Sequence, residues 1–204
     1  MKTIRTFDFE VRAGIDEEHG HTLTGQPIVY NERTNLGWYD EIIADGALTE
    51  TDLRDVRFLV NHNTDMIPLA RSRNNNANST MQMEVIESKG MMIRVDLDTE
   101  NNADARALYS AVERGDISGM SFMFSIDGYK WDEVESDHPT RTVTKIGKVY
   151  EVSAVTVPAY EATSIQARGL ADALDSAKAS LESARAEVRK VELEKTKIKM
   201  LARF

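Results

Sequence analysis

The sequence predicts a mostly β fold with peripheral helices, followed by one long C-terminal helix. Three observations favour this fold class. Short apolar segments separated by turn residues run through residues 1–163, one helical pattern stands among them, and residues 164–204 change to a heptad-like pattern. Short strands joined by turns are typical of an antiparallel barrel. We therefore expect a body over residues 1–163 and a helical segment over residues 164–204.

The first half of the body shows mostly strand patterns. Residues 3–12 and 26–30 read as strands, and the turn-prone residues 31–35 end the second one. A short helix is expected over residues 46–54. Residues 56–60 form a strongly apolar strand, whereas residues 71–80 are rich in Asn and Ser and predict a loop.

The second half of the body contains its clearest helix. Residues 84–86 and 91–97 read as paired strands around a turn at 88–90. The helix over residues 102–114 follows, with Asn101 or Asn102 as its cap and Gly115 just past its end. A strand over residues 117–126 comes next. Residues 128–134 and 141–157 then predict a hairpin with its loop at 135–139.

The C-terminal segment carries a narrow apolar seam with heptad spacing. The seam residues are Leu170, Leu174, Ala177, Leu181, Ala184, Val188 and Val191. Lys195 interrupts the seam and Ile198 resumes it. Such a helix buries little by itself, so we expect it to need a partner helix or a groove; the alternative is a single solvated helix with charge pairs along its surface.

Composition and charge exclude several classes of protein. The absence of Cys removes disulfide frameworks, Cys-based zinc sites and Cys nucleophiles. The net charge of −9 divides into −12 over residues 1–165 and +3 over residues 166–204, so the body is a poor binder of nucleic acid. We also expect no membrane association, because no signal peptide and no apolar run of about 20 residues is visible.

Common motifs for metal and cofactor binding are missing. The sequence has no HExxH motif, no glycine-rich phosphate loop and no EF-hand loop, and we expect no metal and no cofactor. His19 and His21 are interpreted as part of a solvated turn. Gly119 and Ser121 supply only half of a G-x-S-x-G elbow, which leaves an α/β-hydrolase unsupported.

Three residues at strand ends remain as candidates for chemistry. His62 directly follows an apolar strand, which places its imidazole at the edge of the core. Ser121 lies on the strand face opposite Phe122 and Phe124. Glu151 shares a face with apolar neighbours, Val149 among them, so its carboxylate needs a partner, and His62 is a candidate. The alternatives are a structural histidine and a small residue that fits a crowded sheet.

In these regions the sequence resembles the prohead maturation proteases of tailed bacteriophages, serine peptidases related in fold to the herpesvirus assemblins. The similar blocks are GQPIVYN at 25–31, YDEII at 39–43 with Gly46 and Ala47, VNHN at 60–63, PLAR at 68–71, GDISGMSFMF at 115–124 and EVSAVTVPAYEAT at 151–163. The family often has Gly at the positions of Ala70 and Met123. The C-terminal helix lies outside the resemblance.

The resemblance implies a role for each candidate residue. Ser121 would be the nucleophile, His62 the general base and Glu151 the residue that orients the imidazole, with Arg71 contributing to oxyanion or substrate binding directly or through water. Ser118 is the alternative nucleophile. The resemblance also implies an assemblin-like antiparallel β-barrel and a homodimer or higher oligomer.

The implied function is that of a serine endopeptidase in capsid maturation. Its substrate would be the scaffolding part of the major capsid protein or a separate scaffold protein, cleaved inside the immature capsid in the host cytoplasm. The helical tail would dock on scaffold helices or be removed by autoproteolysis. One alternative is a non-catalytic scaffold or capsid-assembly adaptor that works through a coiled coil; another is a hydrolase of small esters.

Overall fold

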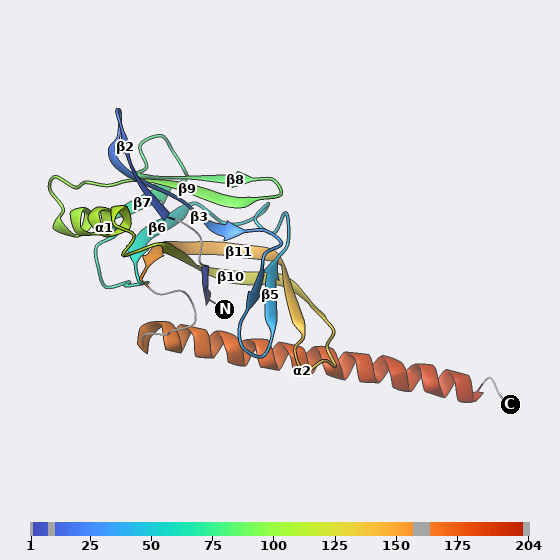
Figure 1. Cartoon of the computed structure of the whole chain (residues 1–204). Helices are drawn as coiled ribbons and strands as arrows, with labels where there is room; N and C mark the ends of the chain where they lie inside the picture. The colour runs from blue at the N-terminus through green and yellow to red at the C-terminus, as the bar shows by residue number, and fades with distance from the viewer. Residues whose placement is uncertain (1, 8–10, 157–163, 202–204) are drawn as a thin grey trace.

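The computed structural model describes residues 2–7, 11–156 and 164–201. It contains two β-sheets, a short helix at one end and a long C-terminal helix (Figure 1). The prediction of a mostly β fold with a long C-terminal helix is therefore confirmed. Among the described residues, no helix combines the length and apolar character that crossing a bilayer requires.

The larger sheet has seven strands and is organised around one long hairpin. Its main path runs β1 (Lys2–Phe7), β10 (Gly119–Asp132), β11 (Thr140–Val155), β5 (Asp40–Ile43) and β4 (Arg33–Asn35). β11 also pairs with β6 (Asp55–Val60), which pairs with β7 (Ala70–Arg73). β1, β10 and β11 are antiparallel, whereas β5 and β6 run parallel to opposite ends of β11.

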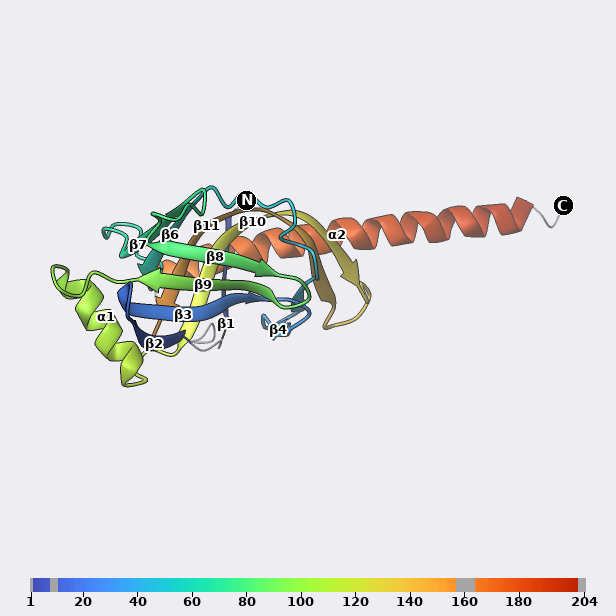
Figure 2. The same ribbon diagram turned by 90° about the horizontal axis from the view of Figure 1, so that it is seen from above.

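The smaller sheet is antiparallel and covers one face of the larger one (Figures 1 and 2). Its strand order is β2 (Val11–Asp16), β3 (Gly20–Val29), β9 (Gly90–Asp96) and β8 (Met81–Ile86). The hydrophobic core combines residues of both sheets, for example Leu23 and Met91 from the smaller and Phe58 and Phe122 from the larger. Both sheets are open within the described residues, so the expected assemblin-like barrel is not confirmed.

The helix caps and the hairpin pattern in the sequence correctly predicted helix α1 and the β10–β11 pair. Helix α1 (Ala103–Glu113) begins after Asn102, whose side chain accepts from the backbone N–H groups of Asp104 and Ala105 at 3.0 and 3.3 Å. Gly115 follows the helix with φ 79°, as a glycine past a helix end does. The predicted hairpin at 128–134 and 141–157 corresponds to the β10–β11 pair, in which β10 is continuous with the preceding predicted strand.

Four local predictions are wrong or incomplete. Residues 45–50 form turns instead of a helix, because i→i+3 bonds such as Thr49 N–H to Gly46 C=O close successive tight turns. The predicted loop at 71–80 begins inside β7, which pairs with β6, and the predicted turn at 31–35 contains β4. The predicted strand at 3–12 divides between β1 and β2, and its residues 8–10 lie outside the described part.

Helix α2 (Ser164–Leu201) runs along the larger sheet on the side away from the smaller one, and then extends past the body (Figures 1 and 2). The seam residues Ala177 and Leu181 are buried, whereas Val188, Val191 and Ile198 are exposed. The seam therefore has a partner over its first half, and that partner is the body. The seam position Leu170 lies outside the described side chains.

Candidate active site

Ser121 lies near the beginning of β10 on the face that points away from the core. Met120, Phe122 and Phe124 belong to the core between the sheets, so strand alternation places Ser121 on the opposite face, as predicted. Ser121 stands opposite Ser153 of β11 on one side and Thr6 of β1 on the other. The nucleophile candidate is therefore held in a fully paired central strand.

His62 occupies a tight turn directly after β6. Its φ is 57° and that of Asn61 is 50°, so two successive non-glycine residues adopt the left-handed conformation. Each such residue costs roughly 1–3 kcal/mol. Hydrogen bonds to β11 and to the residue after it offset this cost: Asn61 N–H donates to Ala154 C=O at 2.9 Å, and Thr156 N–H donates to the Asn61 side chain at 3.0 Å. The turn brings the imidazole back over the sheet.

Glu151 reaches the same face of the sheet through an irregularity in β11. Met123 pairs with Glu151 but Phe124 pairs with Val149, so the register shifts and Tyr150 is the extra residue. Val149 consequently points into the core. The prediction that Glu151 and Val149 share a face is wrong, because simple alternation ignores this bulge.

The three side chains meet in one hydrogen-bonded chain. Nε2 of His62 lies 2.6 Å from Oγ of Ser121, and Nδ1 lies 2.5 Å from Oε1 of Glu151. A carboxylate accepts, so Nδ1–H donates to Glu151 and Nε2 is left to accept the hydroxyl proton of Ser121. This geometry matches what nucleophilic catalysis by serine requires.

The cluster is closed to solvent. The side chains of His62 and Glu151 are 0% and 3% exposed, and Ser121 is 0% exposed, so a peptide needs a rearrangement to reach the hydroxyl. β1 pairs with β10 beside Ser121. β1 therefore lies next to the nucleophile, and α2 packs against β1.

The remaining predicted residues lie outside this chain of hydrogen bonds. The guanidinium of Arg71 on β7 donates to both carboxylate oxygens of Asp55, at 2.6 and 2.8 Å, and its role with the oxyanion stays a prediction. Ser118 precedes β10, and its backbone C=O accepts from Val11 N–H at 3.1 Å.

The interpretation of His21 as part of a solvated turn is wrong. It is half-buried on β3, packs edge-on against Tyr109, and has Nδ1 2.7 Å from the Thr99 hydroxyl. His19 does lie in the β2–β3 turn, where its Nδ1 is 2.9 Å from an Asp16 carboxylate oxygen. Within the described ranges, no group of three or more His, Asp or Glu side chains is placed to hold a metal ion.

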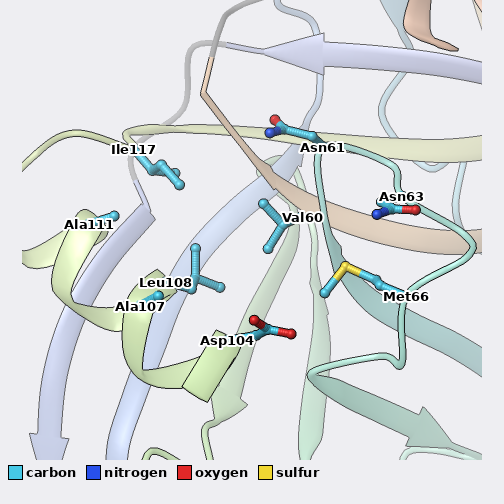
Figure 3. A pocket seen from close by; sticks show the side chains of 9 residues that line it. All are labelled: Val60, Asn61, Asn63, Met66, Asp104, Ala107, Leu108, Ala111 and Ile117. Carbon is cyan, nitrogen blue, oxygen red and sulfur yellow. The ribbon is translucent and has the colours of Figure 1, made fainter. Parts of the chain in front are cut away.

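An open cavity of ≈ 500 Å³ adjoins the His62 turn (Figure 3). Asn61 and Asn63, the two neighbours of His62, line one side, and α1 lines the other. Its lining residues are Val60, Asn61, Asn63, Met66, Asp104, Ala107, Leu108, Ala111 and Ile117. The cavity is largely apolar, and Asp104 adds a carboxylate at its edge.

Ser153 is the residue of the site to which the sequence assigned no role. Its hydroxyl donates to Oε2 of Glu151 at 2.5 Å and accepts from the backbone N–H of His62 at 3.1 Å. One sequence feature could have identified it: Ser153 lies two residues after Glu151, and a strand places two such residues on the same face.

Comparison with protein families gives a match over most of the chain. The family described as caudovirus prohead serine protease matches residues 7–176. No curated protein matches the sequence. Among solved structures, the bacteriophage T4 capsid assembly protease gp21 is similar, with 10% identity, a TM-score of 0.41 and coverage of 76% of this chain and 97% of that one.

Proposed function

The chain belongs to the caudovirus prohead serine protease family, and we propose that Ser121, His62 and Glu151 are its catalytic triad. The observation that carries this proposal is the position of the His62 imidazole, 2.6 Å from the Ser121 hydroxyl and 2.5 Å from the Glu151 carboxylate. Two of these residues lie on strands β10 and β11 and the third in the turn after β6, so they are distant in the sequence.

Each member of the triad has a defined chemical role. Nε2 of His62 takes the hydroxyl proton as Oγ of Ser121 attacks the peptide carbonyl, and later returns it to the leaving amine. Glu151 holds the imidazole in the tautomer that leaves Nε2 free to accept, and stabilises the imidazolium that forms. Because the cluster is buried, this electrostatic stabilisation is stronger than it would be in water.

The substrate we propose is the scaffolding part of the major capsid protein or a separate scaffold protein, cleaved inside the immature capsid. The family assignment supports this class of substrate, since the family is described by its place in the prohead. The cavity lined by Asn61 and Asn63, the chain neighbours of His62, offers room for a side chain of such a protein substrate.

We assign the second half of α2 to substrate docking. Val188, Val191 and Ile198 continue the seam beyond the body and stay exposed, and the segment 166–204 has a net charge of +3. An amphipathic scaffold helix with acidic flanks would cover this seam and complement its charge. Autoproteolysis near residues 161–169 would release this docking segment from the body.

Co-expression with the capsid and scaffold proteins tests the triad. We expect the wild-type chain to cleave one of them, and Ser121→Ala and His62→Ala to abolish cleavage on a gel. Ser125→Ala is the matched control, because Ser125 lies on the same face of β10 and outside the triad. Cleavage that survives in Ser121→Ala and disappears in Ser118→Ala would move the nucleophile to Ser118.

Intact-mass measurement tests autoproteolysis in the same samples. Wild-type protein should lose the C-terminal segment, and Ser121→Ala should keep it. Equal loss of the segment in both proteins would refute autoproteolysis, because a host protease would then be responsible.

A further inference from the structure

We infer that Ser153 is a positioning residue of the protease, which fixes both the general base and the carboxylate that orients it. This inference rests on the proposed triad and adds a fourth member to it. Ser153 is 0% exposed and lies opposite Ser121 in the β10–β11 pair, so its hydroxyl acts inside the closed cluster.

The first contact fixes the carboxylate. Oε1 of Glu151 receives Nδ1–H of His62, and Oε2 receives the hydroxyl proton of Ser153, both at 2.5 Å. With both oxygens engaged, the plane of the carboxylate is set and Oε1 stays in line with the imidazole. The donated proton also compensates a buried negative charge, which is costly to leave without partners.

The second contact fixes the backbone of the general base. The parallel pairing of β6 with β11 ends at Val60, and the N–H of the next residue, Asn61, still reaches the Ala154 carbonyl. The left-handed turn then directs the His62 N–H away from the backbone ladder, and the Ser153 hydroxyl accepts it at 3.1 Å. Ser153 therefore holds the turn from which the imidazole projects.

A single hydroxyl can serve both contacts, because it has one proton to donate and lone pairs to accept. Without it, the imidazole and the carboxylate lose their common anchor. A displacement of about 1 Å in a catalytic group can reduce the rate by about 10²-fold. Substrate binding would stay intact, because Ser153 is buried beneath the reacting groups and does not line the cavity.

The test measures kcat and KM on a fluorogenic peptide that spans the cleavage site found by co-expression. Ser153→Ala should lower kcat about 10- to 100-fold and leave KM within about twofold. Ser72→Ala is the matched control: Ser72 is also 0% exposed, and its hydroxyl has no hydrogen-bond partner among the described residues. This control should leave kcat unchanged.

A second pair of variants isolates the hydroxyl from the packing. Ser153→Thr keeps the hydroxyl and Ser153→Val replaces it with a methyl group of similar size, so any steric strain is common to both. The Thr variant should retain at least tenfold more kcat than the Val variant. Equal kcat in the two variants would overturn the inference, even where Ser153→Ala does not fold.

A double-mutant cycle with Glu151→Gln shows whether Ser153 acts through the triad. If it does, Ser153→Ala should reduce kcat by a smaller factor in the Glu151→Gln background than in the wild type, because the two residues act as a unit. An equal reduction of kcat by Ser153→Ala in both backgrounds would show that Ser153 does not act through the Glu151 carboxylate, and would overturn that part of the inference. Activity remaining in Ser121→Ala would instead contradict the triad itself, so the two failures are distinguishable.

Discussion

The indole N–H of Trp131 on β10 donates to the hydroxyl of Ser180 on α2 at 3.0 Å. This bond joins the C-terminal helix to the strand that carries Ser121. One turn further along α2, Arg185 donates to the backbone carbonyls of Val134 and Ser136, at 2.7 and 3.3 Å. Docking of α2 is therefore directed by polar contacts at the β10–β11 hairpin as well as by the buried seam.

The first prediction concerns this docking. Ala177 of α2 is 0% exposed, so Ala177→Glu would bury a carboxylate against the body, and the helix should detach. Both tryptophans of the chain lie in one stacked pair, Trp38 and Trp131, with ring centroids 5.9 Å apart. Detachment should move their fluorescence emission to longer wavelength, since Trp131 loses its contact with α2.

Ala179→Glu is the control for this prediction. Ala179 lies two residues further on the same helix and is exposed, so the substitution adds the same charge without a buried carboxylate. Its emission spectrum should match that of the wild type. Identical spectra for Ala177→Glu and the wild type would show that α2 stays docked without its seam.

The second prediction concerns a buried ion pair between the neighbouring strands β11 and β5. Arg141 and Glu41 are 4% and 3% exposed, and the guanidinium donates to Oε2 of Glu41 through Nε at 2.8 Å and through a terminal nitrogen at 2.5 Å. Breaking a buried pair leaves an uncompensated charge, at a cost of about 3–5 kcal/mol. Glu41→Gln should therefore lower the free energy of unfolding by about 3 kcal/mol in urea denaturation.

Two further variants serve as controls for this prediction. Replacing both partners, as in Glu41→Leu with Arg141→Met, should recover most of the loss, because no charge is then left unpaired. Glu50→Gln breaks the exposed pair with Lys145 and should change stability little. A double variant as unstable as Glu41→Gln would show that the pair contributes through shape instead of charge.

Local signals in the sequence predicted some elements of the fold and not others. Asn102 and Gly115 act within one helix, so capping alone located α1 correctly. The helix predicted over residues 46–54 is replaced by turns, because the backbone of this segment is hydrogen-bonded to β11. Ile146 N–H donates to Ala47 C=O, and Asp52 N–H donates to Gly147 C=O. The parallel pairing of β11 with β5 and β6 was unpredictable, since strand periodicity is the same in parallel and antiparallel sheets.

The candidate site shows the same division. Alternation along β10 placed Ser121 on the correct face, because that strand is regular around the serine. The prediction that Val149 shares a strand face with Glu151 was wrong, because the bulge between them depends on how β11 pairs with β10. The contact between Ser153 and the His62 backbone depends on a turn 91 residues away in the sequence, which no local pattern reports.

The third prediction is a pH dependence of stability. Burial alone would raise the pKa of Asp40, but hydrogen bonds from His138 and Arg33, both at 2.8 Å, outweigh it and hold this pKa below its usual value. A lowered pKa contributes stability above the unfolded-state pKa of about 3.9, and this stability is lost as the pH falls through the folded-state pKa. Asp40→Asn removes the contribution.

Thermal unfolding at several pH values checks this sign. The wild type should exceed Asp40→Asn in Tm at about pH 6, and the difference should shrink as the pH falls below about 4. Asp137→Asn, an exposed site in the β10–β11 loop, is the control and should follow the wild type. A Tm difference between the wild type and Asp40→Asn that stays constant over this pH range would rule out the carboxylate as its source.

The last prediction addresses Arg71, for which the resemblance implies a role with the oxyanion. Its guanidinium bonds both oxygens of Asp55, and this contact is the main cause that lowers the pKa of the Asp55 carboxyl. If Arg71 stabilises the oxyanion, Arg71→Ala should reduce kcat by about 10²- to 10³-fold and leave KM nearly unchanged. Asp55→Asn should reduce kcat far less, because the guanidinium remains.

Arg73→Ala, on the exposed end of the same strand, is the control and should leave kcat unchanged. Equal and small losses of kcat in Arg71→Ala and Asp55→Asn would instead make the ion pair purely structural, and the oxyanion donors would have to be sought among backbone N–H groups.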